Sequence, residues 1–159
     1  MKLIIGLGNP GEKYKNNRHN VGYMVIDAFQ ESKLPKGVTI RKTDCFMNDS
    51  GLFVKNILSK YPKLSISDLY IIHDDLDIKQ GEYKIQFTKG PKDHNGLLSI
   101  ENEIGTNKFW RARIGVDNRN QDNRTKGEEY VLQDFNVQEK VVIKEVIESI
   151  KRGLLKVVQ

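Results

Sequence analysis

The amino-acid sequence predicts an α/β fold, a three-layer α/β/α sandwich around a mixed, largely parallel sheet. Short apolar runs that are β-branched in part, such as Leu3–Leu7 and Leu69–Ile72, are typical of buried strands. These runs alternate with stretches whose apolar residues recur at helical spacing, and turns rich in Gly and Pro separate the two kinds of segment. Strands that alternate with helices in this way favour parallel pairing of the strands.

Composition indicates one soluble globular domain spanning residues 1–159, with 38% apolar and 30% charged residues. No apolar run is long enough to span a bilayer, and Gly, Asn and Pro interrupt the start of the chain, where a signal peptide would be apolar. Cys45 is the single cysteine, so we expect no internal disulfide and a reducing compartment. A formal net charge of +5 permits a nucleic-acid partner without requiring one.

The first predicted unit is a strand, a loop and a helix. After the strand Leu3–Leu7, the turn at 8–11 contains Gly, Asn and Pro, and a polar loop follows. A helix over 21–32 has an apolar face made of Val21, Met24, Val25, Ala28 and Phe29. Asn20 is placed to cap this helix, so His19 lies beside its N-terminus, at the end of the sheet where α/β folds bind ligands.

The glycines of this turn match a dinucleotide-binding fingerprint, Gly6-x-Gly8-x-x-Gly11. That motif requires a helix that opens on the glycines and an acidic residue about 20 positions later at the end of a strand. Here Pro10 and a polar run intervene, and Asp27 falls within the predicted helix. We therefore reject NAD(P) binding.

The rest of the chain continues the alternation. After a turn at 34–37, the sequence predicts a strand from Val38 toward Phe46 and a turn at 47–51. A helix follows, with an apolar face made of Leu52, Phe53, Ile57 and Leu58. The buried strand Leu69–Ile72 comes next and is followed by a loop at 73–77. There follow a half-exposed strand over 82–88, a loop over 88–96, a helix over 97–104, a strand over 110–116, a very polar segment over 117–127 expected to be mobile, and a long amphipathic helix within 137–158 with Gly153 as a candidate break.

Five polar side chains lie in turns beside these strands and would converge if the strand ends are neighbours: Asn9, His19, Asn48, Asp74 and Asn95. Histidine can transfer a proton near neutral pH, and a carboxylate behind it would fix its tautomer. No Ser or Cys lies in a nucleophile motif, so the base would act on water, a step worth about 10²–10⁴-fold. Asparagine amides suit an ester or amide substrate, since they can hold a peptide group and an oxyanion.

Each of these residues also has a simpler interpretation. Loop histidines are more often surface residues than catalysts, and Asn beside Gly usually serves turn formation. The acids of 73–77 could form a divalent-metal cluster, although adjacent acids on a short loop point in different directions. Cationic residues could line a phosphate path or simply form a solvated face; they are Lys84, Lys89, Lys92, Arg111 and Arg113.

A family resemblance adds to this interpretation. The chain resembles the bacterial peptidyl-tRNA hydrolase family through several motifs in the same order: Gly6–Gly11, Tyr14, Arg18–Asn20, Phe46–Asn48, Ser50-Gly51, His73–Asp77, His94–Gly96, Arg111–Gly115 and Tyr130–Leu132. The matches cover most of the sequence. The resemblance implies a carboxylic ester hydrolase that cleaves the bond between a peptide and the 3′ ribose of tRNA.

The resemblance also implies roles for individual residues. His19 would activate water, Asp74 would hold His19 in its basic form, and Asn9 would contact the peptide backbone. The substrate would be bound by Tyr14, Phe46, Met47, Asn48 and Asn95, with Arg113 and, more weakly, Lys84 contacting phosphate. The family implies no cofactor, no metal, no membrane association and a cytoplasmic monomer that acts in translation and ribosome rescue, with peptidyl-tRNA as its nucleic-acid partner.

The chain departs from the family pattern at three places. The segment 34–45 is short, the loop 88–93 is not rich in glycine, and the C-terminal end is short. These departures concern the sheet edge, the lid over the site and the tRNA-binding groove. They leave two alternatives open: an RNA-binding protein without hydrolysis, as in plant chloroplast intron-splicing factors, and a metal-dependent phosphoesterase built on 73–77.

Overall fold

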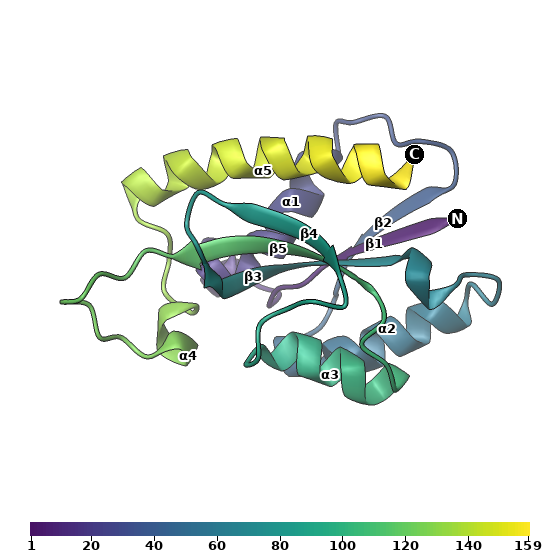
Figure 1. The fold of residues 1–159 in the computed structure, drawn as a ribbon, viewed down its shortest axis with the longest axis horizontal. Helices are drawn as coiled ribbons and strands as arrows, with labels where there is room; N and C mark the ends of the chain where they lie inside the picture. Colours follow the sequence, from purple (N-terminus) through teal and green to yellow (C-terminus); the bar gives the residue numbers. More distant parts are fainter.

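The protein is built on a five-stranded sheet with the strand order β2-β1-β3-β5-β4 (Figure 1), seen in a computed structural model that describes residues 1–159. The strands are β1 (Lys2–Gly6), β2 (Val38–Lys42), β3 (Leu69–Lys79), β4 (Tyr83–Phe87) and β5 (Trp110–Asp117). Strand β4 pairs antiparallel with β5 at one edge, and every other neighbouring pair is parallel. The predicted mixed, largely parallel sheet is confirmed.

Helices cover both faces of the sheet (Figure 1). On one face lie α1 (Val21–Phe29) and α5 (Val137–Val158), and on the other lie α2 (Ser50–Ser59) and α3 (Asn95–Ile104). Alternate residues of β3 fill the two cores, because Tyr70 and Ile72 pack toward α1 and α5 while Leu69 and Ile71 pack toward α2 and α3. The three-layer sandwich follows from this alternation. None of the helices combines the length and apolarity needed to cross a membrane.

The start of α1 lies unusually close to the sheet. A Cβ on Gly6 would lie 2.4 Å from the carbonyl oxygen of Gly22, and a Cβ on Gly22 would lie 2.5 Å from that of Ile72. Only glycine at both positions lets the helix start touch the ends of β1 and β3. This contact brings His19, in the 3₁₀ turn Arg18–Asn20 just before α1, to the carboxyl ends of these strands.

The order of the strands explains why a site forms here. The chain moves from β1 to β2 on one side and to β3 on the other, so the order reverses at β1. Open α/β sheets bind ligands in the crevice beyond the carboxyl ends of strands at such a reversal. Asn9 follows β1 and Asp74 lies on β3, on the two sides of that crevice.

The structure differs from the sequence predictions of local structure at three places. Residues 73–77 are part of β3, which continues to Lys79 with a register irregularity, rather than a loop after it. Helix α5 is not broken at Gly153; the helix continues past this residue, where a Cβ would lie 3.2 Å from the Tyr83 hydroxyl of β4. A short helix that the sequence did not predict, α4 (Gly127–Tyr130), follows the polar segment.

Candidate active site

A cleft of about 870 Å³ lies at the carboxyl ends of β1 and β3. Its lining comes from five parts of the chain: Asn9 and His19; Phe46, Met47 and Asn48; Asp74, Leu76 and Asp77; Pro91 to Asn95; and Arg119 with Lys126, Gly127, Glu128, Val131 and Leu132. The five side chains that the sequence singled out for chemistry, Asn9, His19, Asn48, Asp74 and Asn95, therefore all line one cleft.

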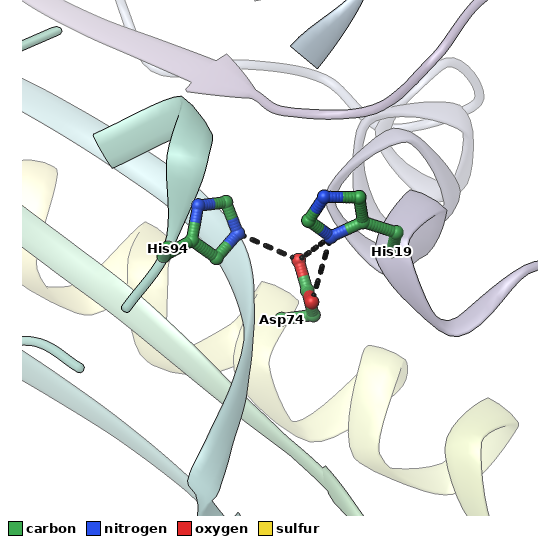
Figure 2. Close-up of side chains that lie close together, drawn as sticks. All are labelled: His19, Asp74 and His94. Atoms are coloured by element: carbon green, nitrogen blue, oxygen red, sulfur yellow. Dashed lines mark hydrogen bonds and ion pairs between the residues drawn. The ribbon is translucent and has the colours of Figure 1, made fainter. Parts of the chain in front are cut away.

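A buried carboxylate binds two imidazoles at the base of this cleft (Figure 2). His19 Nδ1 lies 2.9 Å from Oδ1 and 2.8 Å from Oδ2 of Asp74. His94 Nε2 lies 2.8 Å from Asp74 Oδ1 and approaches from the other side. Asp74 is almost fully buried, whereas His19 keeps 9% of its surface exposed toward the cleft that it lines.

The hydrogen bonds around the two rings assign their tautomers. His94 caps α3, and its Nδ1 accepts the backbone N–H of Leu97, so its proton sits on Nε2 and is donated to Asp74. An ionised Asp74 can only accept, so His19 donates Nδ1–H to it. The Nε2 of neutral His19 is then an acceptor without a partner in the protein, which is the state of a general base.

Charge and burial oppose each other at these residues. Burial disfavours the protonated form of His19, but the Asp74 carboxylate outweighs this effect and raises the pKa of His19 above its ordinary value. Burial alone would raise the pKa of Asp74, yet the imidazoles of His19 and His94 hold it far below its usual range. Asp74 thus remains ionised at neutral pH and supports a stronger base at His19.

The same three side chains have the chemistry of a metal site, since their ligand atoms all lie within 4.8 Å of one another. Their hydrogen bonds do not fit that use. His94 Nε2 carries the proton that it donates to Asp74, so it offers no lone pair unless the cap of α3 is broken. The arrangement matches a hydrogen-bonded base better than a metal centre.

The acids of 73–77 likewise turn to separate partners. Asp74 accepts from the two histidines, Asp75 accepts from Arg113 Nε at 2.7 Å, and Asp77 is exposed. His73 is fully buried, and burial together with the nearby His94 lowers its pKa to about 3, so it stays neutral. The carboxylates do not converge as metal ligands would.

Asn9 and Asn20 hold the strand-loop-helix unit together. The backbone N–H of Asn9 donates to Asn20 Oδ1 at 2.9 Å, and Asn20 Nδ2 donates to the Asn9 carbonyl at 2.8 Å. The prediction that the Asn20 side chain caps α1 is therefore wrong, because these bonds to the facing loop replace the cap. Asn9 Oδ1 accepts the N–H of Met47 at 2.8 Å, which leaves Asn9 Nδ2 as a donor without a protein partner.

The other candidate substrate contacts lie around the rim. Asn48 and Asn95 are exposed, and their side chains have no partner within the protein. Met47 is buried in the cleft wall, and Phe46 projects from it with 55% of its surface exposed. Tyr14 is not part of the lining; it packs edge-on against Phe46, with the ring centroids 6.3 Å apart.

The two candidate phosphate contacts lie outside the cleft lining, on neighbouring strands. Lys84 of β4 stands opposite Arg113 of β5 in the register. Arg113 already donates to Asp75 and to Gln86 Oε1, both at 2.7 Å, whereas Lys84 is exposed and has no ion-pair partner. Lys84 is therefore the freer of the two cations.

Sequence reasoning did not give His94 a role, although it singled out the motif that contains it. The available signal was its place just before a helix, where a capping side chain is held firmly. The wall formed by 119–132 was also missed, because only the folded chain brings the segment before α5 beside the turn that carries His19.

The chain is similar to known proteins over its whole length. The model of the peptidyl-tRNA hydrolase family matches residues 3–159. The peptidyl-tRNA hydrolase of Aquifex aeolicus is 35% identical over 181 aligned positions, covering 100% of this chain and 91% of the relative. That of Sulfurihydrogenibium sp. is 36% identical, covering 100% and 92%.

A solved structure shows the same fold. The crystal structure of peptidyl-tRNA hydrolase from Acinetobacter baumannii superimposes with a TM-score of 0.79 at 26% sequence identity, covering 98% of this chain and 88% of that one. The match of the family model and the identity over the full length together establish that the chain belongs to the peptidyl-tRNA hydrolase family.

Proposed function

We propose that this chain hydrolyses the ester that joins a peptide, or an N-blocked amino acid, to the 3′ ribose of tRNA. The observation that carries the proposal is the His19–Asp74 pair, set in one cleft with the amides of Asn9, Asn48 and Asn95. Membership in the family supports the same reaction. An RNA-binding role without hydrolysis is not favoured, because such a role gives no reason for a buried carboxylate to hold a histidine as a base.

In the proposed reaction, His19 Nε2 takes a proton from water, and the water oxygen attacks the ester carbonyl carbon. Asp74 stabilises the resulting imidazolium through the Nδ1–H bond. The tetrahedral oxyanion is stabilised by amide donors from Asn48 or Asn95 and by the N-terminus of α3, which begins at Asn95. Collapse breaks the bond to the ribose oxygen, which takes the proton from His19 and leaves a free carboxylic acid and a tRNA 3′ end.

Asn9 gives the site a means to distinguish its substrates. Its Oδ1 is bonded to the Met47 N–H, so its amide can present only Nδ2–H donors to the cleft. A peptide carbonyl next to the scissile ester would accept such a donor. A free aminoacyl group carries a cationic amine at that place and cannot, so Asn9 favours peptidyl over aminoacyl substrates.

The remaining contacts complete the proposal. Phe46 and Met47 provide an apolar wall for the peptide, Tyr14 supports Phe46, and Lys84 with Arg113 contacts tRNA phosphate. We further propose that the protein is cytoplasmic and acts as a monomer. Light scattering of the purified chain would test the monomeric state.

Release of N-acetylated amino acid from tRNA tests the function. Wild-type protein should release it in buffer containing EDTA, because no step uses a metal. The His19→Ala variant should lose activity by about 10²–10⁴-fold, the contribution of a general base. Circular dichroism of the variant supplies the control for folding.

Three results would contradict the proposal. If folded His19→Ala kept full activity, His19 would not be the base. If wild-type protein bound tRNA tightly without turnover, the RNA-binding alternative would be correct. Loss of activity on chelation would instead indicate the metal-dependent phosphoesterase.

A further inference from the structure

A buried ion pair lies directly behind the turn that carries His19. Arg18 donates from Nη2 to Glu139 Oε1 at 2.8 Å, and the two side chains are only 7% and 2% exposed. Arg18 Nη1 donates to the carbonyl of Tyr130 at 3.0 Å. Neither residue lines the cleft, and neither has a part in the hydrolysis described above.

Glu139 connects three segments that meet only in the folded chain. Its Oε1 accepts the backbone N–H of Asn136 at 2.9 Å and thereby completes the capping box of α5. Its Oε2 accepts from Asn118 Nδ2 at 3.3 Å. Through Arg18, the same carboxylate reaches the turn Arg18–Asn20, so one side chain ties α5 and the segment after β5 to the base.

Tyr130 extends this connection to the far wall of the cleft. Two guanidinium groups lie over its ring, with that of Arg18 at 3.8 Å and that of Arg119 at 5.0 Å from the centroid. Arg119 lines the cleft. The next residue, Val131, accepts the backbone N–H of His19 at 2.8 Å and also lines the cleft.

We propose that the Arg18–Glu139 pair is a positioning device that fixes His19 against Asp74 and against the 119–132 wall. A buried ion pair contributes little net stability compared with apolar side chains of similar size, so stability alone does not explain why charges occupy this site. Position does explain it, because the pair fixes the residue adjoining His19 in the sequence. The proposal rests on the proposed function for its role in catalysis, but not for its effect on His19 itself.

The double variant Arg18→Met with Glu139→Gln tests the proposal. It removes both charges together, so no unpaired charge is left buried, and Gln keeps the oxygen that accepts the Asn136 N–H. The melting temperature should therefore fall less than in either single variant, which would leave one buried charge unpaired. We expect kcat to fall by about tenfold to hundredfold with little change in KM, since small displacements of a catalytic group cost rates of this size.

The pKa of His19, followed by NMR of its ring, is a second readout that a merely structural pair would not change. The titratable groups that face His19 are Asp74 and His94, and the double variant alters neither. If the ring moves away from Asp74, the pKa of His19 should fall. An unchanged kcat and an unchanged pKa of His19 in a folded double variant would overturn the proposal.

Arg18→Lys keeps the test decisive if the double variant does not fold. Lysine retains the charge opposite Glu139 but cannot also stack on Tyr130 and reach its carbonyl, so kcat should fall in the same direction. Full activity of this variant would also overturn the proposal.

A matched control is Lys2→Met with Asp68→Asn, which removes an ion pair at the opposite end of the strands and should leave kcat unchanged. The NMR comparison separates the two proposals. If the wild type did not hydrolyse peptidyl-tRNA, the proposed function would fail, while the change in the pKa of His19 would still decide whether the pair positions it.

Discussion

At the scale of single residues, two opposing effects set the protonation of His19. Burial favours the neutral ring, while the Asp74 carboxylate favours the cation and prevails. Asp74 in turn stays ionised because two imidazole N–H groups donate to it. His94 thus helps to keep ionised the carboxylate that supports His19, although His94 does not itself take the proton.

The His94→Asn substitution tests this dependence. Asn is a good N-cap, and its Oδ1 can accept the Leu97 N–H as His94 Nδ1 does, but it lacks the Nε2–H that reaches Asp74. A buried hydrogen bond to a charged group contributes about 1.5–3 kcal/mol to stability, so the melting temperature should fall. We also expect kcat to fall by about tenfold to hundredfold, because Asp74 is held less firmly behind His19. Steady-state kinetics and thermal unfolding measure the two effects, and full activity would show that Asp74 does not need His94.

At the scale of elements, the sequence predicted the strands and helices that have a clear hydrophobic period. The strands at 3–7 and 110–116 and the amphipathic C-terminal helix follow from the hydrophobic period, and the structure has each of them close to its expected bounds. Asn20 was wrongly predicted to cap α1, because the same side-chain amide can either cap a helix or bond to the backbone of a facing loop. Only the facing position of Asn9 decides between the two uses.

The contact of α1 with β1 and β3 gives a prediction for stability. In Gly22→Ala, the added Cβ would meet the carbonyl oxygens of Ile72 at 2.5 Å and Leu7 at 2.6 Å, and backbone atoms cannot move aside cheaply. Overpacking of this kind costs about 1–3 kcal/mol, and we expect the free energy of unfolding to fall by that amount in urea titrations. Gly153→Ala is the matched control, because the added Cβ would lie 3.2 Å from the hydroxyl of a tyrosine, at the end of a side chain. An equal loss of unfolding free energy in both variants would show that the close contact at Gly22 does not limit stability.

At the scale of the whole molecule, the net charge of +5 suits the anionic tRNA of the proposed substrate. Each contact between a cation and a phosphate contributes a slope of about −0.7 to −0.9 in a plot of log affinity against log salt concentration. For tRNA binding measured by fluorescence anisotropy, we expect Lys84→Ala to reduce the magnitude of this slope by about the contribution of one phosphate contact. The control is Lys36→Ala, which removes an exposed cation before β2 at the other edge of the sheet and should leave the slope unchanged. Equal slopes for the wild type and Lys84→Ala would exclude a phosphate contact at Lys84.

Much of the cleft could be predicted because Asn9 and Asp74 each come just after a short apolar run that forms part of a strand. The sequence left open whether these strands are neighbours. Asn9 and Asp74 share an edge of the sheet once β1 and β3 are parallel neighbours. The 119–132 wall and the Arg18–Glu139 pair could not be predicted, because they depend on how the segment before α5 folds back onto the turn at Arg18. Residues more than a hundred positions apart in sequence carry no local signal of such contact.

The pH dependence of kcat/KM for the wild type and Asp74→Asn tests the central claim most directly. In the wild type, activity should rise with pH as His19 loses its proton, and the midpoint should lie above the ordinary pKa of histidine. Without the carboxylate, burial should prevail and lower the pKa of His19, so the rise should move to lower pH, while the plateau falls because a weaker base accepts the proton. An acidic limb that stays at the same pH in folded Asp74→Asn would contradict the claim that Asp74 holds His19 as the base.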